Sequence, residues 1–183
     1  MERTKQPDLS VWTIGHSNHS IERFVKLLTM HNIEEIVDTR SHPFSKHAPQ
    51  FDREQISALI SRSDISYVYL GQQLGGRPSE REYYEEDGRL AIDLVWESWR
   101  FKQGITRLMS EIRKGRIALL CAEENPVRCH RRRLITPVLI GQSVSVWHVR
   151  GDSTVQTEAE LARETDIDEA QMPLFPGSAF ARR

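Results

Sequence analysis

Short apolar segments alternate with segments of helical periodicity along most of this 183-residue chain, and this alternation constrains the fold more than any other feature. We predict strands at residues 11–15, 35–39, 66–70, 116–121 and 144–149. Strands that alternate with helices form right-handed βαβ units and a parallel sheet. The sequence therefore predicts an α/β protein with a single-domain, three-layer fold, in which a mostly parallel sheet of about five strands is flanked by helices.

The segments between these strands carry helix and loop signals. Ser20 is a good N-cap for a helix in which apolar residues recur at i, i+3 and i+4 from Ile21. Asn125 and Pro126 are favoured at the cap and first position of a helix, so we expect a helix there that kinks or ends near Pro137. We also expect helices at 55–60 and 101–112, a polar loop at 41–49 and a long loop or lid at 71–90.

The chain becomes polar and acidic after residue 149. We therefore predict an α/β domain at 1–150 and a polar C-terminal extension at 151–183, with a modest helical pattern at 158–163. A chain of this length fits one domain and can bury a core without disulfides or metal ions.

The composition and net charge limit where this protein can be located and which partners it can bind. No apolar run approaches the roughly 18 residues that a membrane span needs, and residues 1–8 lack an apolar signal segment, so we expect a cytoplasmic protein with no membrane contact. The net charge is −1, so any nucleic-acid contact must be local, as in the basic group at 128 and 131–133. The two cysteines of a cytoplasmic chain are more typical of chemistry or ligation than of a structural bridge.

Polar residues follow three of the predicted strands directly. These strand ends carry His16 and Ser17, then Asp38 and Arg40, then Cys121 and Glu123. Ligands of open parallel sheets bind beyond the carboxyl ends of the strands. We therefore expect the three groups to line a common cleft. Asp38 and Arg40 lie two positions apart and should point to the same side, although a solvated ion pair would explain them equally well.

The segment from Cys121 to Arg131 contains both cysteines. We expect Cys121 to end a strand and Cys129 and His130 to lie in the first turn of a helix, where unpaired N–H groups and neighbouring arginines favour a thiolate. Both cysteines could instead be buried packing residues. A zinc or iron site at Cys121, Cys129 and His130, with His16, is a third interpretation, but no Cys-x2-Cys spacing supports it.

The spacing from Cys121 to Arg128 is similar to the anion-binding loops of rhodaneses and cysteine phosphatases, which carry Cys-x5-Arg. Here the spacing is one residue longer. Glu123 and Glu124 also fall within the loop, where their charge would repel a phosphate, so a cysteine phosphatase is disfavoured. Carboxylates at such a place suit acid–base chemistry, hydrogen bonding to a nucleobase or the stabilisation of a cationic, sugar-like centre.

The C-terminal extension contains a short peptide, 171–175, with the sequence QMPLF. It resembles the bacterial peptide that binds the DNA sliding clamp, in which Gln is followed by two variable residues and then Leu-Phe. The resemblance implies that Gln171, Leu174 and Phe175 bind a clamp, with the two apolar side chains in pockets of the partner. Leu174 and Phe175 could instead fold back onto the domain.

Residues 13–149 resemble the family called domain of unknown function 488. The resemblance rests on TIGHS at 13–17, VDTRSHPFS at 37–45, LGGRP at 74–78 and CAEENPVRCHR at 121–131. It implies no reaction, but it marks family-motif positions. These positions are His16, Ser17, Asp38, Arg40, Pro43, Ser45, Cys121, Glu123, Cys129, His130 and Arg131.

These observations favour an enzyme that acts on nucleic acid or a nucleotide-derived substrate, with a link to DNA repair or modification. The expected catalytic residues are Cys121, Glu123, Cys129 and Asp38. The expected substrate-binding residues are His16, Ser17, Arg40, Ser45, Arg77, Arg128, His130 and Arg131. A metal- or redox-sensing thiol module and a non-catalytic DNA-associated adaptor are the alternatives, and the sequence specifies no cofactor.

Overall fold

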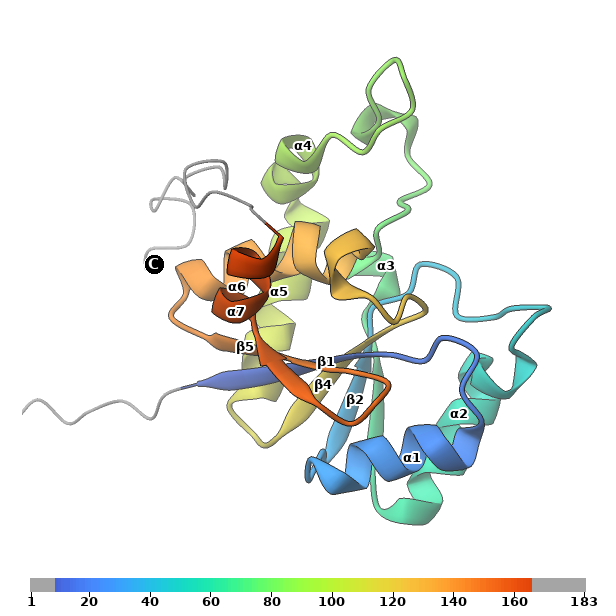
Figure 1. Cartoon of the computed structure of the whole chain (residues 1–183). Coiled ribbons are helices and arrows are strands. Elements are labelled where there is room, and N and C mark those ends of the chain that lie inside the picture. Colours follow the sequence, from blue (N-terminus) through green and yellow to red (C-terminus); the bar gives the residue numbers. More distant parts are fainter. Residues whose placement is uncertain (1–8, 166–183) are drawn as a thin grey trace, which may run out of the picture.

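A six-stranded, mostly parallel sheet forms the centre of the protein (Figure 1). The structure is a computed structural model and describes residues 9–165. The strand order is β3-β2-β4-β1-β5-β6, and only β6 runs antiparallel to its neighbour. The strands are β1 (Ser10–Gly15), β2 (Glu35–Asp38), β3 (Ser66–Tyr69), β4 (Ile117–Cys121), β5 (Ser145–Val149) and β6 (Val155–Thr157). The predicted α/β fold is confirmed, with one more strand than expected.

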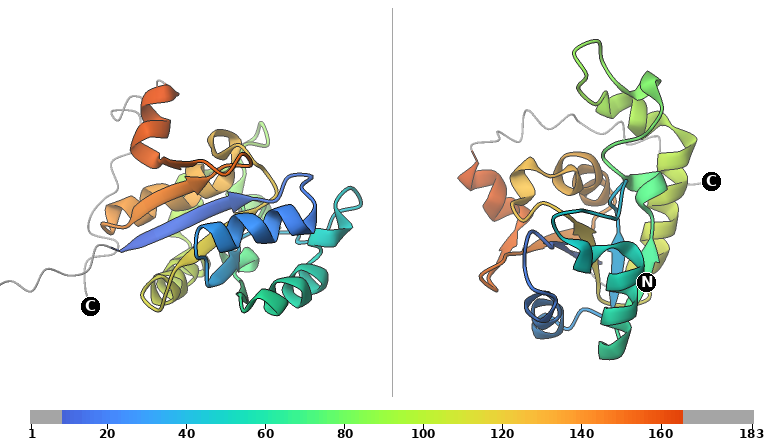
Figure 2. Two further views of the ribbon diagram at one scale, coloured as in Figure 1. Left: turned by 60° about the horizontal axis from the view of Figure 1, so that its bottom comes forward. Right: turned by 90° about the vertical axis from the view of Figure 1, so that its right-hand side faces the viewer.

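Helices cover both faces of the sheet (Figure 2). They are α1 (Ile21–Met30), α2 (Arg53–Ile60), α3 (Gly71–Leu74), α4 (Ile92–Glu97), α5 (Trp99–Ile112), α6 (Thr136–Gly141) and α7 (Glu158–Glu164). On one face, α1 and α2 pack against Ile14 and Leu120. On the other face, α5 and α6 pack against Val11 and Leu119. Alternate residues of each strand thus enter two separate cores, as a three-layer fold requires. Within residues 9–165, no helix has the length and apolar character needed to cross a membrane.

The strand register brings three strand ends together at one edge of the sheet. Gly15 of β1 is paired with Cys121 of β4, and Asp38 of β2 is paired with Leu120. The pairing continues just beyond the strands, because the backbone N–H of His16 donates to the Cys121 carbonyl oxygen over 3.0 Å. The polar residues that follow β1, β2 and β4 therefore start from adjacent positions.

The predicted helix at Asn125 and Pro126 begins later than expected. The Asn125 side chain does accept a hydrogen bond from Val127, but only a 3-10 turn, Pro126–Arg128, follows. The chain then becomes extended at Cys129, and the helix starts at His130. It continues through a π-helical segment, Arg131–Ile135, into α6 without a break at Pro137. Pro137 is the second residue of α6 and follows the π-helical segment directly.

The segment at 71–90, which we expected to be a long loop or lid, begins with a packed helix. Leu74 of α3 is fully buried and lies against Gly104 of α5. A Cβ atom at Gly104 would approach the Leu74 side chain to 2.8 Å, so the glycine allows the two helices to pack closely. The remainder of the segment is irregular apart from a 3-10 turn, Arg81–Tyr83.

Residues 151–165, the first part of the predicted polar extension, join the sheet and its covering layer. β6 pairs with β5, and α7 begins with a capping box formed by Thr157 and Glu160. Glu158 of α7 is buried and accepts hydrogen bonds from Arg132 Nε over 2.7 Å and from His148 Nε2 over 2.8 Å. This buried carboxylate connects α7 to the helix that follows Cys129 and to β5.

Replacing Glu158 by Ala should destabilise the protein by about 3–5 kcal/mol, because buried Arg132 would lose its counter-charge. Urea denaturation followed by circular dichroism measures the change. Glu164→Ala, which removes an exposed carboxylate from the same helix, is the control and should change stability by less than about 0.5 kcal/mol. Equal effects of the two substitutions would show that α7 does not contribute through this buried ion pair.

Candidate functional site

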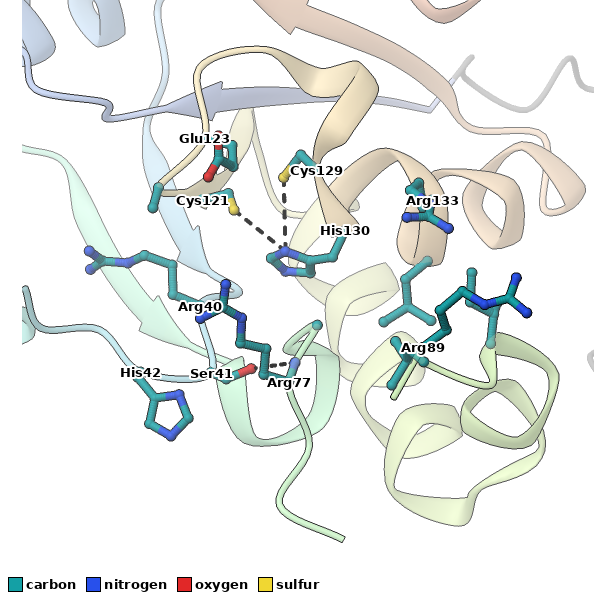
Figure 3. Close-up of a pocket in the computed structure, with 15 residues that line it drawn as sticks. Arg40, Ser41, His42, Arg77, Arg89, Cys121, Glu123, Cys129, His130 and Arg133 are labelled. Atoms are coloured by element: carbon teal, nitrogen blue, oxygen red, sulfur yellow. Dashed lines mark hydrogen bonds between the residues drawn. The ribbon is translucent and has the colours of Figure 1, made fainter. Parts of the chain in front are cut away.

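A pocket of about 420 Å³ opens at the carboxyl ends of β2 and β4 (Figure 3). Its wall is formed by residues 40–42 after β2, 121–123 after β4, and 129, 130, 133 and 134 at the start of the following helix. Residues 76, 77, 89 and 90, from the segment that follows α3, and residue 92, at the start of α4, complete it. Six of the predicted site residues, from segments distant in the sequence, thus line one pocket: Arg40, Arg77, Cys121, Glu123, Cys129 and His130.

The two thiols and one imidazole form a cluster at the inner end of the pocket. His130 Nδ1 lies 3.4 Å from Cys121 Sγ and 3.8 Å from Cys129 Sγ. The other ring nitrogen, Nε2, lies 3.0 Å from the carbonyl oxygen of Thr39. A carbonyl oxygen can only accept, so Nε2 carries the proton and Nδ1 presents a lone pair to the sulfur atoms. Figure 3 shows both sulfur atoms directed toward this ring.

The cysteines differ in how readily they ionise. A hydrogen bond from the Cys129 thiol, assisted by the Arg131 guanidinium and the backbone N–H groups of Glu123 and Ala122, lowers the pKa of Cys121 to about 6 despite its burial. The same interaction with Cys121, together with burial, raises the pKa of Cys129 to about 12. The pair therefore gives up its first proton easily and holds the second.

The Arg131 side chain is buried beside the cluster and does not line the pocket. Its side chain is 1% exposed, and its Nε and backbone N–H donate to Cys129 Sγ over 3.0 and 3.4 Å. Its NH2 group donates to the Glu123 carbonyl oxygen over 2.5 Å. We expected Arg131 to bind substrate, and the structure places it where it orients the loop after β4.

Asp38, expected to be catalytic, lies behind Arg40 and is fully buried. Its carboxylate accepts two hydrogen bonds from Arg40 Nε, over 2.9 and 3.1 Å, and one from Arg40 NH2 over 2.6 Å. Tyr67 donates a further hydrogen bond over 2.5 Å. Burial, with the Asp38 charge beside it, raises the pKa of this phenol. The carboxylate therefore fixes the orientation of Arg40, which does line the pocket.

The other predicted residues lie around this site or outside what the structure describes. His16 is buried, stacks on Phe51 at 4.4 Å and lies 3.2 Å from Arg40 NH1. Ser17, at a φ of 46°, and Ser45, whose backbone N–H donates to Asp52, are not part of the pocket wall. The Arg128 side chain and the peptide at 171–175 lie outside the described part of the structure.

Several pocket residues were not expected from the sequence. Arg133 follows His130 by three positions, so the two residues lie on the same face of the helix. This helical spacing was the signal that could have identified Arg133. Arg89 lies on an irregular segment with no such periodicity. Glu124, which we expected to repel phosphate, instead forms an ion pair with Arg150 at 2.9 Å and is absent from the pocket wall.

Gly76 explains why the LGGRP segment can approach the cluster. A Cβ atom at this position would lie 2.5 Å from His130 Cβ and 2.7 Å from its Cγ, so only glycine allows this contact. The neighbouring Arg77 backbone N–H donates to Ser41 Oγ over 2.9 Å, which fixes the segment against the loop after β2. The glycine thus brings Arg77 to the mouth of the pocket.

The fold and the site define an α/β protein with a thiol–imidazole cluster at the carboxyl edge of a mostly parallel sheet. A family model described as "Domain of unknown function DUF488" matches residues 20–137, and the chain belongs to this family. Comparison with curated proteins and with solved structures gives no match. The TIGHS motif and the clamp-like peptide lie outside the matched range and remain predictions.

His16 should make stability depend on pH. Burial, with the Arg40 charge as a further cause, lowers the pKa of His16 from 6.5 to about 4 in the folded protein. Below pH 6.5 the unfolded chain therefore binds a proton that the folded protein excludes, and stability falls until about pH 4. The stability advantage of the wild type over His16→Gln should shrink by up to about 3 kcal/mol over this interval.

Chemical denaturation at a series of pH values measures this difference. His47→Gln, at an exposed position on the loop after β2, serves as the control and should keep a constant difference from the wild type. A pH-independent difference for His16→Gln would show that the buried imidazole is not excluded from protonation.

Proposed function

We propose that this protein is an enzyme that acts on nucleic acid or on a nucleotide-derived substrate, and that the substrate phosphate binds among the arginines of the pocket. The observation that carries the proposal is the charge of the pocket wall. Four arginines line it, while Glu123 is the one carboxylate among the lining residues. A protein with a net charge of −1 has concentrated positive charge at this place, which suits an anionic substrate.

Two of the four arginines are available to an anion. Arg40 forms a buried ion pair with Asp38. Arg89 forms ion pairs with Asp87 at 2.6 Å and with Glu85 at 3.1 Å. Within residues 9–165, no carboxylate forms an ion pair with Arg77 or Arg133. Guanidinium groups bind phosphate through paired N–H donors. We therefore assign phosphate binding to Arg77 and Arg133, with Arg40 held in the pocket wall beside them by Asp38.

The reacting part of the substrate would face the inner end of the pocket. There Cys121 supplies a nucleophile or a thiolate ligand, and Glu123 supplies a carboxylate for proton transfer. Asp38 would act through Arg40, as a positioning residue without substrate contact. A link to DNA repair or modification in the cytoplasm is part of the proposal and is supported by the clamp-like peptide at 171–175.

The cluster also favours a second candidate function, a metal- or redox-sensing module. Cys121, Cys129 and His130 offer three ligand atoms within 4.8 Å of one another. A sensor would bind the metal or react with the oxidant without turning over a substrate. The arginine-lined pocket supports the enzyme more strongly, because sensing by the cluster requires no anion site beside it.

Arg77→Ala and Arg133→Ala should each weaken the binding of a fluorescent single-stranded oligonucleotide by about tenfold or more, since each removes a charge-assisted hydrogen-bond donor. Fluorescence anisotropy at fixed salt concentration measures the affinity. Arg163→Ala, at an exposed position on α7, removes the same charge outside the pocket and is the matched control. Equal affinity of the pocket variants and this control would refute the proposed phosphate site.

The clamp-like peptide gives a separate prediction. Leu174→Ala combined with Phe175→Ala should abolish binding to a bacterial sliding clamp, because both apolar anchors are lost. Met172→Ala changes a variable position of the pattern and should leave the affinity unchanged. Isothermal titration calorimetry with the full chain measures both. Undiminished binding of the double variant would rule out this peptide as the contact.

Removing the residues after Asp168 separates the enzyme from a non-catalytic adaptor. The truncated chain should keep its oligonucleotide binding if the pocket carries the function. An adaptor that works through the tail would instead lose its function with these residues.

A further inference from the structure

We infer that Cys121, Cys129 and His130 bind a zinc ion at the inner end of the pocket, with the fourth coordination position facing the substrate space. All three residues line the pocket, and their ligand atoms lie within 4.8 Å of one another. Within residues 9–165, they form the one group of three such side chains with this spacing. Two thiolates and an imidazole are ligands that zinc prefers.

The distances fit a tetrahedral zinc ion. With zinc–sulfur bonds of about 2.3 Å and zinc–nitrogen bonds of about 2.05 Å, a sulfur and a nitrogen ligand lie about 3.6 Å apart. His130 Nδ1 lies 3.4 Å from Cys121 Sγ and 3.8 Å from Cys129 Sγ. Both sulfur–nitrogen distances therefore lie within a few tenths of an ångström of the value that a shared zinc ion requires.

The hydrogen bonds of the His130 imidazole favour its role as a metal ligand over a role as the acceptor of a single thiol hydrogen bond. Nδ1 has one lone pair and can accept one S–H group, yet two sulfur atoms face it. The opposite nitrogen donates to the Thr39 carbonyl oxygen over 3.0 Å. Histidine ligands of metal ions commonly donate their second N–H to a carbonyl or carboxylate in this way, because it fixes the tautomer and the ring orientation.

The surroundings of the two cysteine sulfur atoms also suit the binding of a metal ion. Cys129 Sγ accepts hydrogen bonds from the Nε and the backbone N–H of Arg131. These donors and the positive charge stabilise a thiolate and compensate part of the negative charge that a two-thiolate site carries. Cys121 ends a fully buried strand, so the ligands come from a strand end and a helix start that are both fixed by the core.

The inference deepens the proposed function by naming the group that would act on the substrate. A zinc ion with three protein ligands keeps one position for water or substrate and acts as a Lewis acid. Glu123 lines the same pocket and would accept or donate a proton there, while Arg77 and Arg133 hold the phosphate. Under this inference Cys121 is a ligand and not a nucleophile.

Metal analysis of the purified full-length protein tests the inference without any substrate. We expect about one zinc ion per chain by inductively coupled plasma mass spectrometry. After removal of the metal, titration with Co²⁺ should give the visible absorption of a tetrahedral site and a thiolate charge-transfer band. Cys121→Ser, Cys129→Ser and His130→Gln should each lower the zinc affinity by more than about 100-fold. His47→Gln, at an exposed site, is the control and should keep its zinc.

The Co²⁺ spectrum of the unaltered chain gives a result even if a cysteine variant fails to fold. A protein that contains no zinc and shows no thiolate band with Co²⁺ would overturn the inference. Full zinc content in all three variants would also overturn it, since the ion would then lie elsewhere. Because the oligonucleotide measurements on Arg77 and Arg133 need no metal, failure of the zinc site and failure of the proposed function are distinguishable.

Discussion

The buried guanidinium of Arg131 is the interaction on which the site depends. It donates to Cys129 Sγ and to the Glu123 carbonyl oxygen, and its NH1 lies 3.5 Å from Thr13 Oγ1. One side chain thereby joins the start of the helix, the loop after β4 and β1. A buried charge of this kind is stable only when its donors are satisfied, so the positions of the loop and the thiols are fixed together.

Hydrogen bonds extend from Arg131 to the C-terminal elements of the sheet. Thr13 Oγ1 lies 2.9 Å from His148 Nδ1, and His148 Nε2 pairs with Glu158. Burial lowers the pKa of His148, so the ring is neutral, accepts from Thr13 and donates to the Glu158 carboxylate. Thr13, His148 and Glu158 all lie outside the family-matched range, residues 20–137, yet they support a residue inside it. The site thus relies on elements from both ends of the described chain.

The sequence predicted those parts of the structure that follow from local pattern. The five parallel strands were recognisable because strands buried on both faces are apolar runs. The pocket lies at the carboxyl ends of the strands, where the candidate site was predicted, because parallel strands end at one edge. β6 was missed, since VQT is too short for a pattern, although the capping box at Thr157 and Glu160 was a signal for α7. Side-chain direction was the other limit, because spacing could not show that the Arg131 side chain turns into the core and away from the pocket wall.

A crystal structure with a bound mononucleotide tests the central claim most directly, namely that distant segments converge on one pocket that holds a phosphate beside the thiol–imidazole cluster. We predict phosphate density between Arg77 and Arg133, with the rest of the nucleotide directed toward Cys121. A nucleotide bound at another surface, with the pocket closed by the protein's own side chains, would contradict the account.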